Sequence, residues 1–213
     1  MVDPGPGLAE HRDRILAEVA DARRVHLLVT HHHPDHAEGA PALARALGVP
    51  VIGPGPWADQ RLHPGDEWET DDGRLVPVPT PGHSPDHTVF HWPEGDAVFV
   101  GDLLLGEGET TWVGEYPGCV ADYLQSLEVL EDLGAGTLYS AHGPPITDSP
   151  QRIGRFREHR LRRIREVAEL RRRRPQASPE ELTAEVYGTE LPRRLEVAAL
   201  ESIRAILHHL QGG

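Results

Sequence analysis

The stretch Thr30-His31-His32-His33-Pro34-Asp35-His36 constrains this chain more than any other part of its sequence. Four of its side chains are potential metal ligands: His31, His33, Asp35 and His36. Imidazole and carboxylate ligands together suit zinc and related divalent ions. In an extended backbone alternate residues point the same way, so His31, His33 and Asp35 are expected to share one face. His36 is then expected to lie beside them. The stretch therefore predicts a metal site whose first ligands are close together in the sequence.

Three more potential ligands follow later in the chain, each at the end of a strand-like run: His83, Asp102 and His142. Side chains in loops at strand ends are held by a rigid scaffold and remain reachable by a substrate. A single histidine is usually a surface or core residue, but four strand ends that all carry ligands are hard to explain by chance. Seven ligands suffice for two metal ions, and we expect two Zn²⁺ per chain, or two other divalent ions in their place.

Length and composition place the chain among globular proteins. At 213 residues it can build one sizeable core, or a catalytic domain with a small appendage. Its apolar runs fall far short of the roughly 20 residues that span a bilayer, so no membrane association is expected. The first residues show no basic region followed by an apolar stretch, so no signal peptide is predicted. The single Cys119 excludes an internal disulfide and fits a reducing compartment, which predicts a cytoplasmic protein.

Charge changes sign along the chain. Residues 1–150 contain 7 Arg against 25 Asp and Glu, which gives 7 − 25 = −18, whereas residues 151–213 contain 14 Arg against 9 Glu, which gives +5. Such an asymmetry marks either a segment that faces nucleic acid or a solvated helix face. The sequence leaves both interpretations open.

Periodicity predicts an α/β arrangement in the first part of the chain. Trp57 and Trp68, in a loop-like segment, are expected to pack, and the Gly-rich loop 103–118 is long enough to line a site. The expected helices are 8–24, 38–47 and 123–133, and the expected strands are 25–29, 49–52, 74–79, 88–91, 97–100 and 137–140, of which 88–91 and 97–100 form a hairpin.

The last part of the chain is predicted to be helical. A long Arg-rich helix is expected over 151–174, and a third helix from Pro192 to about residue 210. Between them Ser178 and Glu181 have the spacing of a capping box, with Pro179 at the first helical position, so a second helix is expected to run to Tyr187. We therefore predict a catalytic domain over 1–148 and a small helical module over 149–213.

The ligand pattern resembles that of the metallo-β-lactamase superfamily, whose defining motif is His-x-His-x-Asp-His. His83 lies in the expected Thr-Pro-Gly-His context, Asp102 in Gly-Asp and His142 in His-Gly, and the resemblance covers most of residues 1–150. It implies a four-layer αββα sandwich. It also implies one metal held by His31, His33 and His83, a second held by Asp35, His36 and His142, and Asp102 as the bridge between them.

Three shorter segments are similar to the β-lactamase-like protein 2 branch of that superfamily: Val2 to Pro6, Gly82 to His87 and Glu158 to Leu161. Members of this branch carry a C-terminal winged-helix-like domain, and one of them is an endoribonuclease that acts on single-stranded RNA. Compared with that pattern, the chain starts at the Asp-Pro-Gly segment and stops at the third helix. We therefore expect the first strands of the sandwich and the β-wing to be missing.

Two metals held 3.5–4 Å apart would acidify water and polarise a substrate oxygen. Asp35 is the expected proton acceptor, and His87 is a partner of the ligands, a proton donor or a surface residue. Three functions remain open. The first is an endonuclease of single-stranded RNA, the second a small-molecule thioester or ester hydrolase of glyoxalase II type, and the third a non-enzymatic module that binds nucleic acid or protein on a metal-binding scaffold. The expected substrate is accordingly a small molecule or single-stranded RNA. Two copies of the chain could also form a homodimer.

Overall fold

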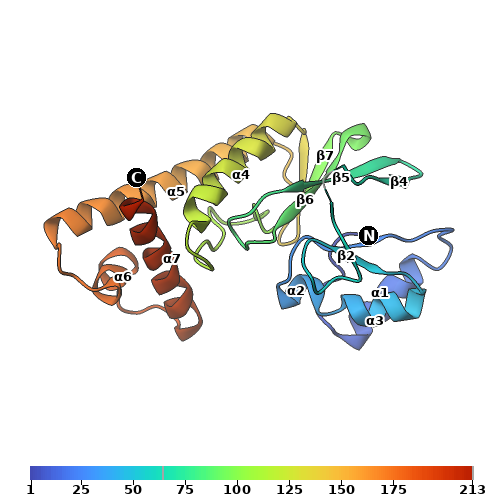
Figure 1. The fold of residues 1–213 in the computed structure, drawn as a ribbon, viewed down its shortest axis with the longest axis horizontal. Coiled ribbons are helices and arrows are strands. Elements are labelled where there is room, and N and C mark those ends of the chain that lie inside the picture. The colour runs from blue at the N-terminus through green and yellow to red at the C-terminus, as the bar shows by residue number, and fades with distance from the viewer. Residues whose placement is uncertain (64, 213) are drawn as a thin grey trace.

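The computed structural model describes residues 1–63 and 65–212, and its two sheets lie between layers of helices (Figure 1). The elements in chain order are α1 (Ala9–Glu18), β1 (Leu27–Leu28), α2 (Pro34–Ala37), α3 (Ala40–Leu47), β2 (Val51–Gly53), β3 (Gln60–Arg61), β4 (Trp68–Thr70), β5 (Gly73–Pro79), β6 (Thr88–Trp92), the 3₁₀ turn η1 (Pro93–Gly95), β7 (Ala97–Gly101), α4 (Cys119–Leu133), β8 (Thr137–Ser140), α5 (Ser149–Arg173), α6 (Pro179–Tyr187) and α7 (Arg193–Gln211).

The two sheets differ in strand direction. The first has the order β1-β2-β3 and is parallel throughout. The second has the order β4-β5-β6-β7-β8 and is antiparallel except for its last pair, β7 and β8. Parallel neighbouring strands need a crossover connection, and α4 provides it between β7 and β8. The predicted hairpin is confirmed as β6 and β7, which pair antiparallel.

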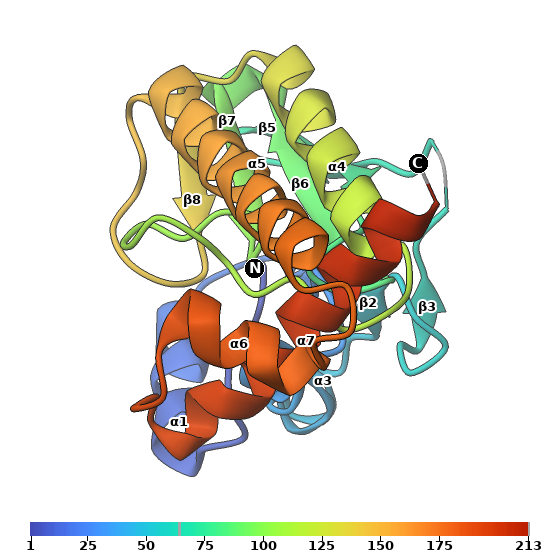
Figure 2. The same cartoon turned by 90° about the vertical axis from the view of Figure 1, so that its left-hand side faces the viewer.

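Side chains that alternate along β1 hold the layers together. Leu27 packs with Leu43 of α3, whereas Leu28 points the other way and packs with Phe90 of the second sheet. The outer face of the second sheet is covered by α4 and α5, which lie side by side in Figure 2. The order is therefore helix, sheet, sheet, helix, as expected.

Several boundaries differ from the sequence-based expectation. The first helix ends at Glu18 rather than near residue 24, and the strand expected over 25–29 is reduced to β1. The segment 57–73 was expected to be a loop, but it contains β3 and β4. Trp68 packs in the core between the sheets, as predicted, because β4 turns it inwards. Trp57 stays partly exposed and donates a hydrogen bond from Nε1 to Asp86 Oδ2 at 3.1 Å.

The last helices form one core with the second sheet. Phe156 of α5, Leu182 of α6 and Ile206 of α7 belong to the same buried cluster as Tyr123 of α4. The capping box of Ser178 and Glu181 is present. Within 149–212 the structure contains three helices and no strand. The winged-helix resemblance stays a prediction. The domain boundary at residue 148 and the missing first strands also stay predictions. No helix in the described part of the chain is long and apolar enough to cross a membrane.

Candidate metal centre

The fold brings all seven predicted ligands together, because each follows the end of a strand or lies on a short helix beside it. His31 and His33 follow β1, and Asp35 and His36 lie on α2; His83, Asp102 and His142 follow β5, β7 and β8. Their ligand atoms form two groups, and the atoms within each group lie within 4.8 Å of one another. We call His31, His33 and His83 the histidine cluster, and Asp35, His36, Asp102 and His142 the mixed cluster.

The expectation that Asp35 shares a face with His31 and His33 is wrong. Pro34 occupies the first turn of α2, where its fixed φ favours helix initiation. The backbone therefore turns after His33, and it carries the Asp35 side chain to the mixed cluster.

The rings of His31 and His83 are each held by a hydrogen bond at the nitrogen that faces away from the histidine cluster. The Thr30 hydroxyl donates to Asp3 Oδ2 at 2.8 Å, so its oxygen accepts from His31 Nδ1 at 2.9 Å. His83 Nδ1 donates to the carbonyl of Trp112 at 3.0 Å. His83 Nε2 then faces His33 Nδ1 at 2.9 Å. These contacts point His31 Nε2 and His83 Nε2 into the cluster.

The mixed cluster is held more loosely. His36 is buried, and its Nδ1 donates to Asp3 Oδ2 at 2.9 Å. By contrast the side chains of Asp35 and His142 are 54% and 48% exposed. His142 Nε2 lies 3.2 Å from Asp35 Oδ2. One wall of this cluster is therefore open to solvent.

Asp102 spans the two clusters. Its Oδ2 lies 3.6 Å from His83 Nε2, and its Oδ1 lies 3.5 Å from the Nε2 atoms of both His36 and His142. His87 holds the backbone of Asp102 in position, since the Asp102 N–H donates to His87 Nε2 at 3.1 Å. The other ring nitrogen of His87 bonds Thr80 Oγ1 at 3.0 Å, so both nitrogens are engaged. A Cβ at Gly101, whose φ is +48°, would lie 2.8 Å from His87 Nε2, so this approach requires glycine.

The clusters shift histidine pKa values in opposite directions. Burial lowers the pKa of His31 strongly, and the neighbouring histidines lower it further. Burial also lowers the pKa of His83 to about 4, although Asp102 opposes the shift. At His36 burial acts in the same direction, but the carboxylates of Asp102 and Asp3 outweigh it and raise the pKa to about 10. The histidine cluster thus favours neutral rings, which are the form that binds metals.

These donors fit a pair of divalent metal ions. His31 Nε2, His36 Nε2 and Asp102 Oδ1 are buried and make no hydrogen bond within the described part of the chain. A buried polar atom without a partner costs about 1–3 kcal/mol, and a bound cation would satisfy all three atoms. Five imidazoles and two carboxylates form a donor set that suits zinc.

Two supporting residues were not predicted from the sequence. Asp3 accepts hydrogen bonds from the backbone and hydroxyl of Thr30 and from His36, and its φ of +51° turns its carboxylate towards them. Glu115, in the loop 103–118, lies 3.1 Å from His32 Nε2 and 3.3 Å from His33 Nε2. The Asp-Pro-Gly sequence at residues 3–5 could have indicated a role for Asp3 in the site. The sequence around Glu115 contains no motif that indicates such a role.

The helices at the end of the chain hold the loop 103–118 in place, and it lines the site as predicted. Trp112 Nε1 donates to the carbonyl of Ala198 at 3.2 Å, and the buried Arg160 donates to the carbonyl of Thr111 at 3.0 Å. A Cβ at Gly114 would lie 2.9 Å from backbone atoms of α7, so the loop backbone is pressed against that helix. Since His83 bonds the Trp112 carbonyl, α5 and α7 support a predicted metal ligand through this loop.

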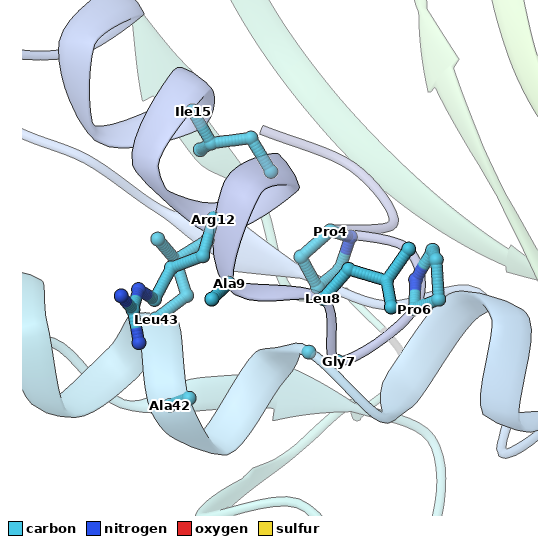
Figure 3. A pocket seen from close by; sticks show the side chains of 10 residues that line it. Pro4, Pro6, Gly7, Leu8, Ala9, Arg12, Ile15, Ala42 and Leu43 are labelled. Carbon is cyan, nitrogen blue, oxygen red and sulfur yellow. The ribbon is translucent and has the colours of Figure 1, made fainter.

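A cavity of about 570 Å³ borders the open side of the mixed cluster. Asp35, His36 and His142 line one part of it, and Phe99 and Tyr139, stacked at 5.2 Å, line another. Its size is that of a small-molecule site. A second cavity, of about 60 Å³, lies between α1 and α3 and is lined mostly by apolar groups such as Leu8, Ile15 and Leu43 (Figure 3). It contains no predicted ligand and is far too small for a substrate.

Comparison with known proteins gives relatives that match almost the whole chain. A "Beta-lactamase-like protein 2 homolog" from Caenorhabditis elegans is 28% identical over 99% of this chain and 74% of its own length. An "Atrochrysone carboxyl ACP thioesterase" from Aspergillus chevalieri is 32% identical over 100% of this chain and 75% of its own length.

Solved structures agree on the fold. A beta-lactamase domain protein from Burkholderia ambifaria superposes with a TM-score of 0.84 at 23% identity, covering 99% of this chain and 76% of its own. A metallo-beta-lactamase family protein from Thermus thermophilus gives a TM-score of 0.79 at 24% identity, covering 99% and 84%. The family model of the metallo-beta-lactamase superfamily matches residues 1–142. The chain therefore belongs to the metallo-beta-lactamase superfamily.

Proposed function

We propose that this protein is a hydrolase of acyl thioesters that uses two zinc ions, one at each cluster. The observation that carries the proposal is the convergence of seven donor groups, three of which have buried atoms with no other partner in the described part of the chain. His31, His33 and His83 would hold one ion, Asp35, His36 and His142 the other, and Asp102 both. When bound, such a pair acidifies water and polarises a substrate carbonyl.

The chain's own groups provide the rest of the reaction. Asp35 Oδ2, exposed and 3.2 Å from His142 Nε2, is placed to take the proton of the attacking water. The water oxygen bonds the carbonyl carbon, the C–S bond breaks, and a carboxylic acid and a thiol are the products. His87 keeps Asp102 in place through the Asp102 N–H. The aromatic part of the 570 Å³ cavity, Phe99 and Tyr139, suits the apolar part of an acyl group.

The leaving group favours a thioester over RNA. Thiols have a pKa of about 8.5, so a thiolate leaves without a strong proton donor, whereas a ribose oxygen needs one. From the sequence, His87 was a candidate donor, but both of its ring nitrogens are engaged in hydrogen bonds. Two of the relatives named as thioesterases are each 32% identical to this chain.

RNA cleavage remains the second candidate, because residues 151–213 carry a net charge of +5 and one relative is a β-lactamase-like protein 2 homolog. However, many of these arginines already have partners within the chain. Arg152, Arg160 and Arg171 donate to backbone carbonyls, and Arg157, Arg163, Arg172, Arg173, Arg174 and Arg204 pair with glutamates. Fewer guanidinium groups are therefore free to bind phosphates than the number of arginines suggests.

A substrate panel tests the proposal. Zinc-loaded protein is assayed on acyl thioesters of N-acetylcysteamine of increasing chain length, on the matching oxoesters and on a labelled single-stranded RNA. We expect thioester turnover that Asp35→Asn reduces at least about a hundred-fold, as removal of a group that transfers the proton requires. Asp132→Asn, at an exposed position of α4, is the control and should keep full activity.

Two outcomes would overturn the thioester proposal. Cleavage of RNA without thioester turnover would establish the nuclease instead. Tight metal binding with no turnover of any substrate would favour a metal-binding scaffold, the non-enzymatic alternative.

A further inference from the structure

Glu115 is a carboxylate that contacts a predicted metal ligand from outside the cluster. Its Oε2 lies 3.3 Å from His33 Nε2 and its Oε1 lies 3.1 Å from His32 Nε2. His33 Nδ1, on the other side of the same ring, faces His83 Nε2 at 2.9 Å. The ring of His33 therefore stands between the histidine cluster and the Glu115 carboxylate.

The neighbouring ligands explain what such a contact does. A neutral imidazole carries its proton on one nitrogen and binds a metal through the other. At His31 the Thr30 hydroxyl oxygen accepts the Nδ1 proton, and at His83 the Trp112 carbonyl accepts it. For His33 to offer Nδ1 to the cluster, its proton must lie on Nε2. The group that faces Nε2, at 3.3 Å, is Glu115 Oε2, a buried atom that has no hydrogen-bond partner in the described part of the chain and is free to accept this proton.

The position of Glu115 is itself fixed from two sides. His32 contacts Glu115 through Nε2, and its Nδ1 lies 2.8 Å from Asp86 Oδ1. Asp86 also accepts hydrogen bonds from the Ser84 hydroxyl and from Trp57 Nε1. On the other side the backbone of the preceding Gly114 is pressed against α7. His32, adjacent to two ligands in sequence, thus contacts a carboxylate outside both clusters.

We propose that Glu115 is a positioning residue that fixes the orientation and the Nε2-protonated tautomer of His33, and so strengthens metal binding at the histidine cluster. This inference rests on the proposed metal centre but not on the substrate. His32, His33 and Glu115 could themselves surround a cation. Because a neutral His33 has one lone pair and its Nδ1 faces His83, that arrangement would compete with the histidine cluster.

Metal binding is the direct test. Zinc affinity is measured by competition with a chromophoric chelator, for wild type, Glu115→Ala and Glu115→Gln. Loss of a group that orients a metal-bound histidine typically weakens affinity about 10- to 100-fold, so we expect Glu115→Ala to weaken one of two sites by this factor. Glu115→Gln, whose amide oxygen can still accept a hydrogen bond, should retain part of the affinity. Glu107→Gln, an exposed acid in the same loop, is the matched control and should bind as wild type does.

Two spectroscopic measurements separate positioning from a general structural defect. Long-range ¹H–¹⁵N spectra of zinc-loaded wild type should show His33 protonated at Nε2. In the cobalt-substituted protein, Glu115→Ala should change the visible absorption of one ion and leave the other as in wild type. The thermal midpoint of the chelated variant should match that of chelated wild type.

The outcomes are distinct. Unchanged affinity in Glu115→Ala, or a proton on Nδ1 of His33 in the wild type, would exclude the positioning role. Three zinc ions per chain in wild type and two in Glu115→Ala would show a separate cation site instead. If the wild type bound no zinc at all, the proposed metal centre itself would fail.

Discussion

The histidine cluster and the mixed cluster differ in how their side chains are held. In the histidine cluster, each ring contacts a partner through its outward nitrogen: Thr30 for His31, Glu115 for His33 and Trp112 for His83. In the mixed cluster only His36 is braced in this way, by Asp3, and Asp35 and His142 are about half exposed. One half of the centre is thus assembled in advance, and the other half adjoins a cavity and can exchange water and substrate.

The largest effect is expected where the two clusters meet. Asp102→Asn removes the negative charge that lies between them, so both ions should be lost and hydrolysis should fall well beyond the hundred-fold effect typical of supporting residues. Elemental analysis and the thioester assay measure these losses. Retention of two zinc ions in this variant would mean that Asp102 does not bridge the clusters.

His142→Ala should break only the mixed cluster. Its ring is about half exposed, so we expect one ion to be lost, the second to be retained, and the unfolding free energy of the chelated protein to change by less than about 0.5 kcal/mol. Zinc content and chemical denaturation provide the measurements. Equal loss of both ions would show that the clusters do not act separately.

The pH dependence of stability should also divide between the clusters. After chelation, the raised pKa of His36 gives stability that is fully present below about pH 6.5, the pKa in the unfolded chain, and is lost as pH rises towards about 10. The lowered pKa values of His83 and His87, about 4 and about 3, work the other way and remove stability as pH falls below about 6.5.

His36→Gln should therefore flatten the decline in stability between pH 7 and pH 10. The change on the acid side should be smaller, and it arises because His36 helps to lower the pKa values of His83 and His87. Denaturant unfolding at a series of pH values measures both limbs. Comparison of slopes within each variant removes any uniform loss of stability. An alkaline decline as steep in His36→Gln as in wild type would contradict the assignment.

Trp112→Phe should have the smallest effect on the metal centre. It removes the Nε1 hydrogen bond to Ala198 and leaves the Trp112 carbonyl that holds His83, so we expect a loss of about 1 kcal/mol in stability. Zinc release from the histidine cluster should become faster, while release from the mixed cluster should not. Stopped-flow exchange with a chelator resolves the two rates. Faster release from the mixed cluster would contradict the separation.

The sequence predicted the groups that carry the chemistry better than those that position them. All seven predicted ligands come together because each follows a recognisable strand end and their residue types are typical of metal sites. Asp35 was placed on the wrong face because Pro34 starts a helix too short to show periodicity. Glu115 and Trp112 could not be connected to His33 and His83 from the sequence, since these contacts join segments far apart in the chain. β3 is only two residues long, too short for a strand pattern, and β1 forms over only two residues of the strand expected at 25–29.

The hydrogen bond from Trp112 to Ala198 has a consequence for biosynthesis. The ribosome makes the ligand-rich stretch at residues 31–36 before α7, so a nascent chain presents its histidines to the surrounding solution before the loop that holds His83 has its support. Copper binds such ligands more tightly than zinc does, so an early, unshaped site would discriminate poorly between them. Packing of α7 would then set the moment at which the centre acquires its shape, and correct metal loading would follow the synthesis of that helix.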